Sequence, residues 1–163
     1  MARESDGPWY YEQTCLGYNY RMTDLQAALG TSQMKRLNDF VSQRHELASR
    51  YDDMLSNYPL TIPWQHPDTY SAYHLYPIRL QLDESKKGRL EIFEYLRSYG
   101  IGVNVHYIPV PSQPYYESMG FDCNDYPEAI KYYREAISLP IYPGLTFEQQ
   151  EFVVQILDKA LGK

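Results

Sequence analysis

A helical pattern from residue 23 to residue 57 constrains the fold of this chain more than any other feature of its sequence. Thr23 and Gln26 have the spacing of a capping box, which predicts that a helix begins at Asp24. Gly30 weakens a helix by about 1 kcal/mol relative to alanine, so we expect one long helix or two nearly collinear helices with a bend or break over residues 30–33. Apolar residues then recur at steps of three and four, namely Leu37, Phe40, Val41, Leu47, Ala48, Tyr51, Met54 and Leu55.

Beyond residue 57, strand patterns alternate with amphipathic helices, which predicts an α/β fold with helices on one side of a mainly antiparallel sheet. Pro77 lacks a backbone donor, so its strand is predicted to lie at a sheet edge or to be bulged. Thr146 and Gln149 repeat the capping-box spacing. Strands are expected over 60–62, 74–82 and 101–107, helices over 86–99, 125–137 and 146–161, and a short extended piece over 138–142.

The first 22 residues show little periodicity and many aromatic side chains, which is typical of an arm that packs on another surface. We therefore expect an arm over residues 1–22 and one domain over residues 23–163, which includes the long connecting helix at 23–57.

Composition excludes several functional classes. The formal charge of −6 and the pI near 5.2 argue against a nucleic-acid surface, which needs basic residues to neutralise phosphates. No apolar run approaches the ~20 residues of a membrane span, and the start of the chain lacks the apolar stretch of a signal peptide. Two distant cysteines without metal-ligand spacing predict a reduced, cytoplasmic protein and no metal site.

The loop before Asp24 is the first candidate site. Asn19 and Arg21 precede the N-terminus of the predicted helix, where backbone N–H groups favour anions. An amide and a guanidinium both bind phosphate well. The residues alone leave other roles open, because Asn19 could simply shape the turn and Arg21 could form a surface ion pair.

The sequence of this loop resembles the signature of the DegT/StrS family of pyridoxal-phosphate-dependent sugar-nucleotide aminotransferases. The likeness begins with Gly-Tyr-Asn-Tyr-Arg-Met-Thr-Asp over residues 17–24 and Gln-Ala-Ala over 26–28, and it continues over 7–13, 64–76, 100–110 and 139–145. Segment 64–76 is most similar to the branch that aminates a UDP-linked keto-dideoxy sugar on the way to pseudaminic acid. The resemblance implies the small C-terminal domain of a fold-type-I transferase.

The same resemblance implies roles for particular residues. Asn19 would reach the cofactor phosphate of the neighbouring subunit, and Arg21 would make that site electropositive. The segment His106, Tyr107, Ile108 and Pro109 would lie near the sugar nucleotide, although a histidine beside a tyrosine is often only structural. His74 is interpreted as structural, and the carboxylates of Asp52 and Asp53 are interpreted as a solvated helix face.

The chain also departs from the family pattern. Pro111 stands where relatives carry a second histidine, so either that histidine is dispensable or the choice of substrate differs. The lysine that binds the cofactor lies on a large upstream domain in this family, whereas the first lysine here is Lys35, in the predicted helix after the loop.

The sequence therefore predicts a C-terminal fragment that has no catalytic residue and binds no pyridoxal phosphate alone. Its expected partners are its own large N-terminal domain, a second subunit of a homodimer, and a keto-sugar nucleotide aminated from an amino acid, by family expectation glutamate. The alternatives are a stand-alone noncatalytic module for dimerisation or binding, and a subunit of a split enzyme.

Overall fold

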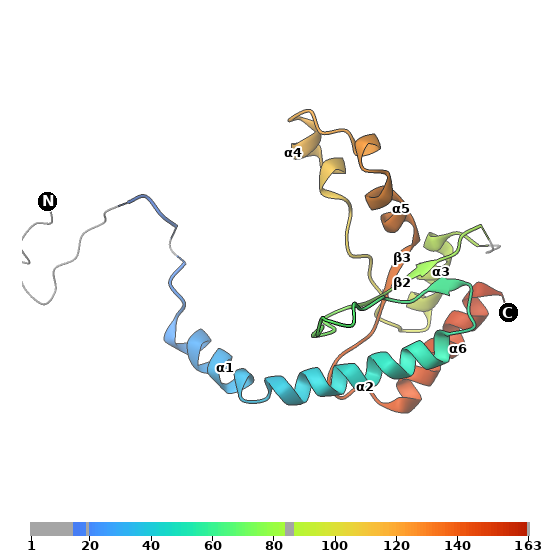
Figure 1. Ribbon diagram of the computed structural model, residues 1–163, viewed down its shortest axis with the longest axis horizontal. Coiled ribbons are helices and arrows are strands. Elements are labelled where there is room, and N and C mark those ends of the chain that lie inside the picture. Colours follow the sequence, from blue (N-terminus) through green and yellow to red (C-terminus); the bar gives the residue numbers. More distant parts are fainter. Residues whose placement is uncertain (1–14, 19, 84–86, 163) are drawn as a thin grey trace, which may run out of the picture. The chain divides into compact units, whose positions relative to one another are not determined.

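The computed structural model describes residues 15–18, 20–83 and 87–162 (Figure 1). The chain divides into two units, one up to Arg36 and one from Leu37 onward. In the first unit, α1 (Asp24–Met34) begins at the predicted capping box. Gln26 N–H donates to Thr23 Oγ1 at 3.3 Å, and Thr23 N–H donates to Gln26 Oε1 at 3.0 Å. No residue of α1 is buried, so this helix is stabilised by its cap rather than by packing.

The predicted helical stretch is two helices rather than one. The interruption falls at Lys35 and Arg36, before α2 (Leu37–Leu55), and not within residues 30–33. Gly30 lies inside α1, because a glycine lowers helix propensity without blocking the hydrogen bonds. The chain turns instead where Arg36 N–H donates to the Gln33 carbonyl at 3.0 Å, a tighter i→i+3 bond typical of helix ends.

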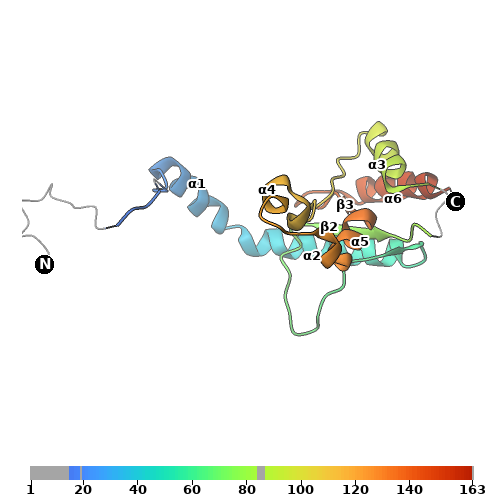
Figure 2. The ribbon, with the colours of Figure 1, turned by 90° about the horizontal axis from the view of Figure 1, so that it is seen from above.

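The second unit holds a three-stranded antiparallel sheet, formed by β1 (Leu60–Thr61), β2 (Tyr76–Leu80) and β3 (Ala136–Leu139) in that order. The loop between β1 and β2 projects away from the sheet in Figure 2. One sheet face is apolar and includes Tyr76 and Ile78. Helices α2, α3 (Arg89–Ser98) and α6 (Phe147–Leu161) supply the rest of the same buried core. The expected α/β fold with helices packed on an antiparallel sheet is confirmed.

Pro77 lies in the middle strand, so the prediction of an edge position or bulge was wrong. The register explains why a proline is tolerated there. Ser138, opposite Pro77, directs both its N–H and its carbonyl to Asn104 on its other side, at 2.8 and 3.3 Å. The Pro77–Ser138 pair is therefore of the non-hydrogen-bonded kind. On the other flank, β1 pairs only with Arg79 and Leu80, so no ladder bond requires an N–H at residue 77.

The strand expected over 101–107 is reduced to one bridge between Asn104 and Ser138. Val103 N–H donates to the Ile101 carbonyl at 2.9 Å, so this local bond takes a donor that a longer ladder would need. The helix expected over 125–137 is α5 (Pro127–Glu135), and the chain enters β3 at Ala136.

The remaining boundaries agree closely with the sequence. Gly100, at φ +76°, follows α3, and α6 begins at the predicted box of Thr146 and Gln149. Segment 107–126 extends away from the sheet (Figure 1) and holds three short helices that the sequence did not predict: η1 (Val110–Ser112), α4 (Pro114–Glu117) and η2 (Cys123–Asp125). Within the described ranges, no helix has the length and apolar character needed to cross a membrane.

Candidate functional site

A cavity of about 640 Å³ opens in the second unit beside the chain that follows β3. Its walls come from four places: residues 74–75 before β2, residues 100–106 after α3, residues 138–145 in and after β3, and the first turns of α6. The lining combines apolar side chains with a few polar groups, as ligand pockets commonly do. His106 is among these polar groups.

Two side chains hold the His106 ring. The Nδ1 atom lies 2.9 Å from the hydroxyl of Ser138, and the Nε2 atom lies 3.5 Å from the Asn104 amide nitrogen. An amide NH₂ can only donate, so Nε2 is the acceptor and Nδ1–H donates to Ser138. Ser138 is 4% exposed and lies in β3, so a strand of the sheet sets the orientation of the ring.

The structure places the other predicted substrate residues differently. The Tyr107 and His106 rings meet edge to face, with their centroids 4.7 Å apart. Tyr107 and Ile108 are exposed, and Pro109 is buried. None of these three residues lines the cavity, whereas His74, interpreted as structural, does. The geometry therefore joins His106 with Asn104 and Ser138, two residues that the sequence did not single out.

Arg21 lies in the first unit, beside a hollow of about 480 Å³ at the N-terminus of α1 that Tyr20, Met22 and Gln26 also line. Within the described chain, its guanidinium forms no hydrogen bond or ion pair, so the surface ion pair considered for it is not formed there. Asn19 lies outside the described residues.

The donors at this hollow fit the phosphate of pyridoxal phosphate, because a guanidinium beside a helix N-terminus provides both charge and hydrogen bonds. Covalent attachment of that cofactor needs a lysine. Among the described residues, no lysine lines this hollow or the His106 cavity. The described residues also contain no cluster of three or more potential metal ligands.

A second cavity of about 670 Å³ lies between β2 and α5 and contains none of the predicted site residues. Arg79 and Glu135 form an ion pair in its wall, with Nη2 and Oε2 2.7 Å apart. This pairing neutralises both side chains, so they add no net charge to the cavity.

The interpretation of Asp52 and Asp53 as a solvated pair was wrong for Asp52. The Tyr76 hydroxyl donates to Asp52 Oδ1 at 2.5 Å, and Asp52 is half-buried while Asp53 is exposed. Burial raises the pKa of Asp52, and the bond from Tyr76 opposes that rise. The pKa of the Tyr76 hydroxyl is raised by its own burial and by the neighbouring carboxylate.

Arg44 and His45 organise the loop before β2, and neither role was expected from the sequence. Arg44 Nη1 donates to the carbonyls of Tyr73 at 2.8 Å and of Ile141 at 2.8 Å. His45 Nε2 lies 2.7 Å from the Ser71 carbonyl, which can only accept, so this nitrogen carries the proton. A signal was present in the sequence, since Arg44 lies midway in the five-residue gap between Val41 and Leu47 in the apolar stripe of α2. Burial lowers the pKa of Arg44.

Comparison with protein families matches residues 1–158 to the DegT/DnrJ/EryC1/StrS aminotransferase family. Among curated proteins, the chain is 43% identical over 156 residues to the spore coat polysaccharide biosynthesis protein SpsC of Bacillus subtilis. That match covers 93% of this chain and 40% of SpsC. The chain thus spans about two fifths of the length of this relative.

Solved structures show the same relation. One is the sugar aminotransferase Spr1654 of Streptococcus pneumoniae, which has been solved in apo, PMP and PLP forms. Its apo form is 30% identical in sequence to this chain, with a TM-score of 0.86 over 96% of this chain and 39% of that protein. Helicobacter pylori PseC, an aminotransferase involved in pseudaminic acid biosynthesis, is 28% identical, with a TM-score of 0.84 over 96% of this chain and 42% of PseC.

Proposed function

The chain belongs to the DegT/DnrJ/EryC1/StrS aminotransferase family, and on this premise we propose that it is the small C-terminal domain of a sugar-nucleotide aminotransferase. The complete enzyme would transfer an amino group from an amino acid, by family expectation glutamate, to a keto-sugar nucleotide. The observation that carries the proposal is the family match over residues 1–158, in which the signature loop precedes the capped N-terminus of α1.

In this proposal, the chain contributes binding groups rather than the reactive centre. Pyridoxal phosphate, when bound, stabilises the carbanion formed during amino transfer. Asn19 and Arg21 bind the phosphate of the cofactor held by the other subunit, and the exposed guanidinium of Arg21 beside the α1 hollow supports that role. His106 contacts the sugar nucleotide, with Tyr107, Ile108 and Pro109 forming the adjoining surface.

We further propose that the substrate is a UDP-linked keto-dideoxy sugar on a route to pseudaminic acid. The similarity to PseC supports this choice. The enzyme would act in the cytoplasm as a homodimer. Each small domain would join its own large domain and would also contribute residues to the cofactor site of the other subunit. Pro111, in η1, replaces a histidine of the family and is the residue most relevant to a different choice of sugar.

A second candidate is a noncatalytic binding or dimerisation module, or one subunit of a split enzyme. Both candidates agree with the finding that no described lysine lines either candidate site. The DNA upstream of the Met1 codon distinguishes the two proposals. An open frame that encodes a lysine-bearing large domain supports the complete aminotransferase, whereas a stop codon followed by a start at Met1 supports the second candidate.

The role of Asn19 can be tested in the protein expressed from the complete reading frame. One hydrogen bond to a charged phosphate contributes about 1.5–3 kcal/mol, so Asn19→Ala should weaken pyridoxal phosphate binding about 10- to 100-fold. Asn38→Ala, an exposed asparagine on α2, is the matched control and should leave binding unchanged. An equilibrium titration in which Asn19→Ala retains the wild-type cofactor affinity would remove this claim.

A further inference from the structure

Arg44 joins two segments that are far apart in the sequence. It lies on the same face of α2 as the buried residues Leu47, Ala48 and Tyr51, three, four and seven positions later. Its Nη1 atom donates to the carbonyls of Tyr73 at 2.8 Å and His74 at 3.3 Å before β2, and of Ile141 at 2.8 Å after β3. A single guanidinium nitrogen thus holds both chain segments against α2.

The two segments form neighbouring parts of the His106 cavity wall. His74 and Leu75 line it from the loop before β2, and Pro140, Ile141 and Tyr142 line it from the chain after β3. Carbonyl groups of these segments accept from Arg44, so a shift of its guanidinium would move both parts of the wall. Residues 73–75 and 140–142 lie outside the strands, so no regular ladder of backbone hydrogen bonds holds them. Hydrogen bonds from side chains hold them instead.

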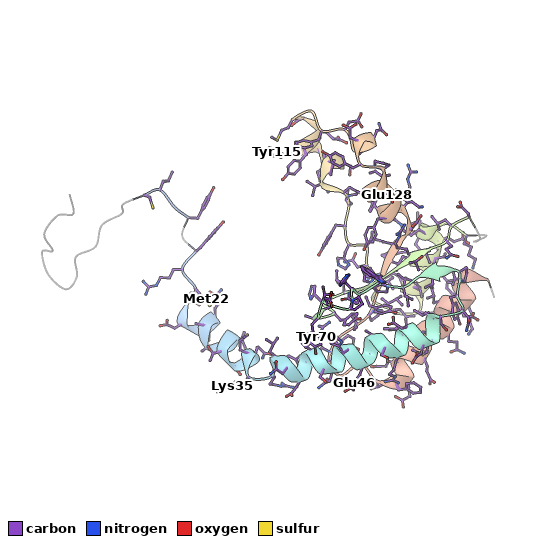
Figure 3. All side chains as sticks on the ribbon, viewed as in Figure 1. Met22, Lys35, Glu46, Tyr70, Tyr115 and Glu128 are labelled. Carbon is purple, nitrogen blue, oxygen red and sulfur yellow. The ribbon has the colours of Figure 1, made fainter. Side chains whose placement is uncertain are left out.

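The loop before β2 holds a conformation that needs such support. Tyr73 has φ +42°, in the left-handed region that non-glycine residues seldom adopt. Ser71 Oγ accepts from Tyr73 N–H at 3.1 Å, and Arg44 donates to the Tyr73 carbonyl. His45 donates to the Ser71 carbonyl and packs between Tyr73 and Tyr70, the residue labelled in Figure 3. Strained backbone that is held from several sides is frequent at functional sites.

We propose that Arg44 is a positioning residue that fixes these two wall segments of the His106 cavity relative to each other and thereby orients the ligand bound in the cavity. Arginine suits this task because its donors are fixed in one plane, whereas lysine offers one flexible ammonium group. The identity of the ligand, a keto-sugar nucleotide, rests on the proposed function. The coupling of the two walls rests on the hydrogen bonds alone.

Each wall keeps one other anchor when Arg44 is replaced, so a substitution there need not unfold the chain. The Tyr51 hydroxyl donates to the Pro140 carbonyl at 3.0 Å, and His45 continues to hold Ser71. Arg44→Gln therefore tests the coupling of the walls in a folded protein.

Hydrogen–deuterium exchange of the 163-residue chain, measured by mass spectrometry, gives the first test. Arg44→Gln should speed exchange about tenfold or more in segments 69–76 and 139–145 together, because the bond from a charged donor corresponds to at least a factor of ten in the opening equilibrium. His45→Ala should affect segment 69–76 alone. Arg50→Gln removes a guanidinium of α2 that packs over Phe147 and should change neither segment.

The alternatives give different patterns. Exchange that stays at the wild-type rate in either segment of Arg44→Gln would overturn the proposal. Faster exchange throughout β2 and α6 would also overturn it, because it would show a loss of global stability. Arg44→Lys should recover part of the protection, because its ammonium keeps a charged donor on α2 but lacks the fixed planar geometry of the guanidinium. Equal loss of protection in Arg44→Lys and Arg44→Gln would contradict positioning by hydrogen bonds.

Kinetics of the protein from the complete reading frame provide the second test. Arg44→Gln should raise KM for the keto-sugar nucleotide about tenfold and leave kcat within about twofold. An unchanged KM would refute positioning of the ligand, even if exchange is faster. If the wild-type enzyme aminates no keto-sugar nucleotide, the proposed function fails, while the exchange experiment still decides whether Arg44 couples the walls.

Discussion

The hydrogen bond between Tyr76 and Asp52 should make a measurable contribution to stability that depends on pH. The Tyr76 ring is fully buried beside Tyr51, with ring centroids 4.9 Å apart, and its hydroxyl donates to Asp52 Oδ1 at 2.5 Å. Tyr76→Phe removes this donor and keeps the packing of the ring. The variant therefore isolates one bond to a charged acceptor.

The expected cost follows from the exposure of the two groups. A hydrogen bond to a charged partner contributes about 1.5–3 kcal/mol. Asp52 is only half-buried, so in the variant its carboxylate recovers water and part of the loss is offset. We expect Tyr76→Phe to lower the free energy of unfolding at pH 7 by about 1–2 kcal/mol.

The sign of the pH dependence follows from the pKa of Asp52. Burial raises this pKa in the folded state, and the Tyr76 bond partly lowers it, so the pKa should rise further in Tyr76→Phe. A carboxyl group whose pKa is raised in the folded state binds its proton more readily when folded. This stabilises the fold as pH falls through that pKa toward the unfolded value of about 4. The deficit of Tyr76→Phe should therefore shrink between pH 7 and pH 4.

Urea unfolding of the 163-residue chain, followed by circular dichroism at several pH values, measures this effect. In the Asp52→Asn background, the amide oxygen still accepts from Tyr76 but no longer titrates, so the cost of Tyr76→Phe should become independent of pH. Asp53→Asn replaces the exposed neighbour and should shift stability by less than about 0.5 kcal/mol. A deficit below ~0.5 kcal/mol at pH 7, or one that is equal at pH 7 and pH 4, would refute the reasoning.

Three further substitutions test the helix caps and the candidate site. Thr146→Ala should destabilise the chain by about 1 kcal/mol in urea unfolding, because α6 packs into the core. Thr23→Ala, at the equivalent position of α1, should leave the global midpoint unchanged because α1 has no buried residue. Ser138→Ala should cost about 1 kcal/mol and shift the ¹⁵N resonance of His106 Nδ1 in NMR spectra, since this nitrogen loses its 2.9 Å partner. An unmoved resonance would contradict the assigned bond.

Features encoded by short-range patterns were predictable from the sequence. Both capping boxes, the apolar stripe of α2 and the helix from residue 147 depend on residues three or four positions apart, and the structure shows all of them. The α/β class also followed, because alternation of strand and helix patterns is local. The signature loop indicated the family, and the match over residues 1–158 agrees.

The starts of helices were predicted from the sequence more accurately than the pairing of strands was. Pro77 was expected at a sheet edge or in a bulge, and residues 101–107 were expected to form a strand, because both predictions used the properties of one segment. The structure shows that Ser138 binds Asn104 on one side and leaves a non-hydrogen-bonded pair with Pro77 on the other. A single long-range register decided both outcomes.

The sequence by itself thus determined the family, the helix caps and the apolar faces, since each depends on neighbours along the chain. Tertiary structure alone decided that His106 meets Ser138 and Asn104, that Asp52 accepts from Tyr76, and that Arg44 binds carbonyls of two separate segments of the cavity wall. These bonds join residues as many as 97 positions apart. Because such pairs are set by how the sheet and helices pack, no local pattern specifies them.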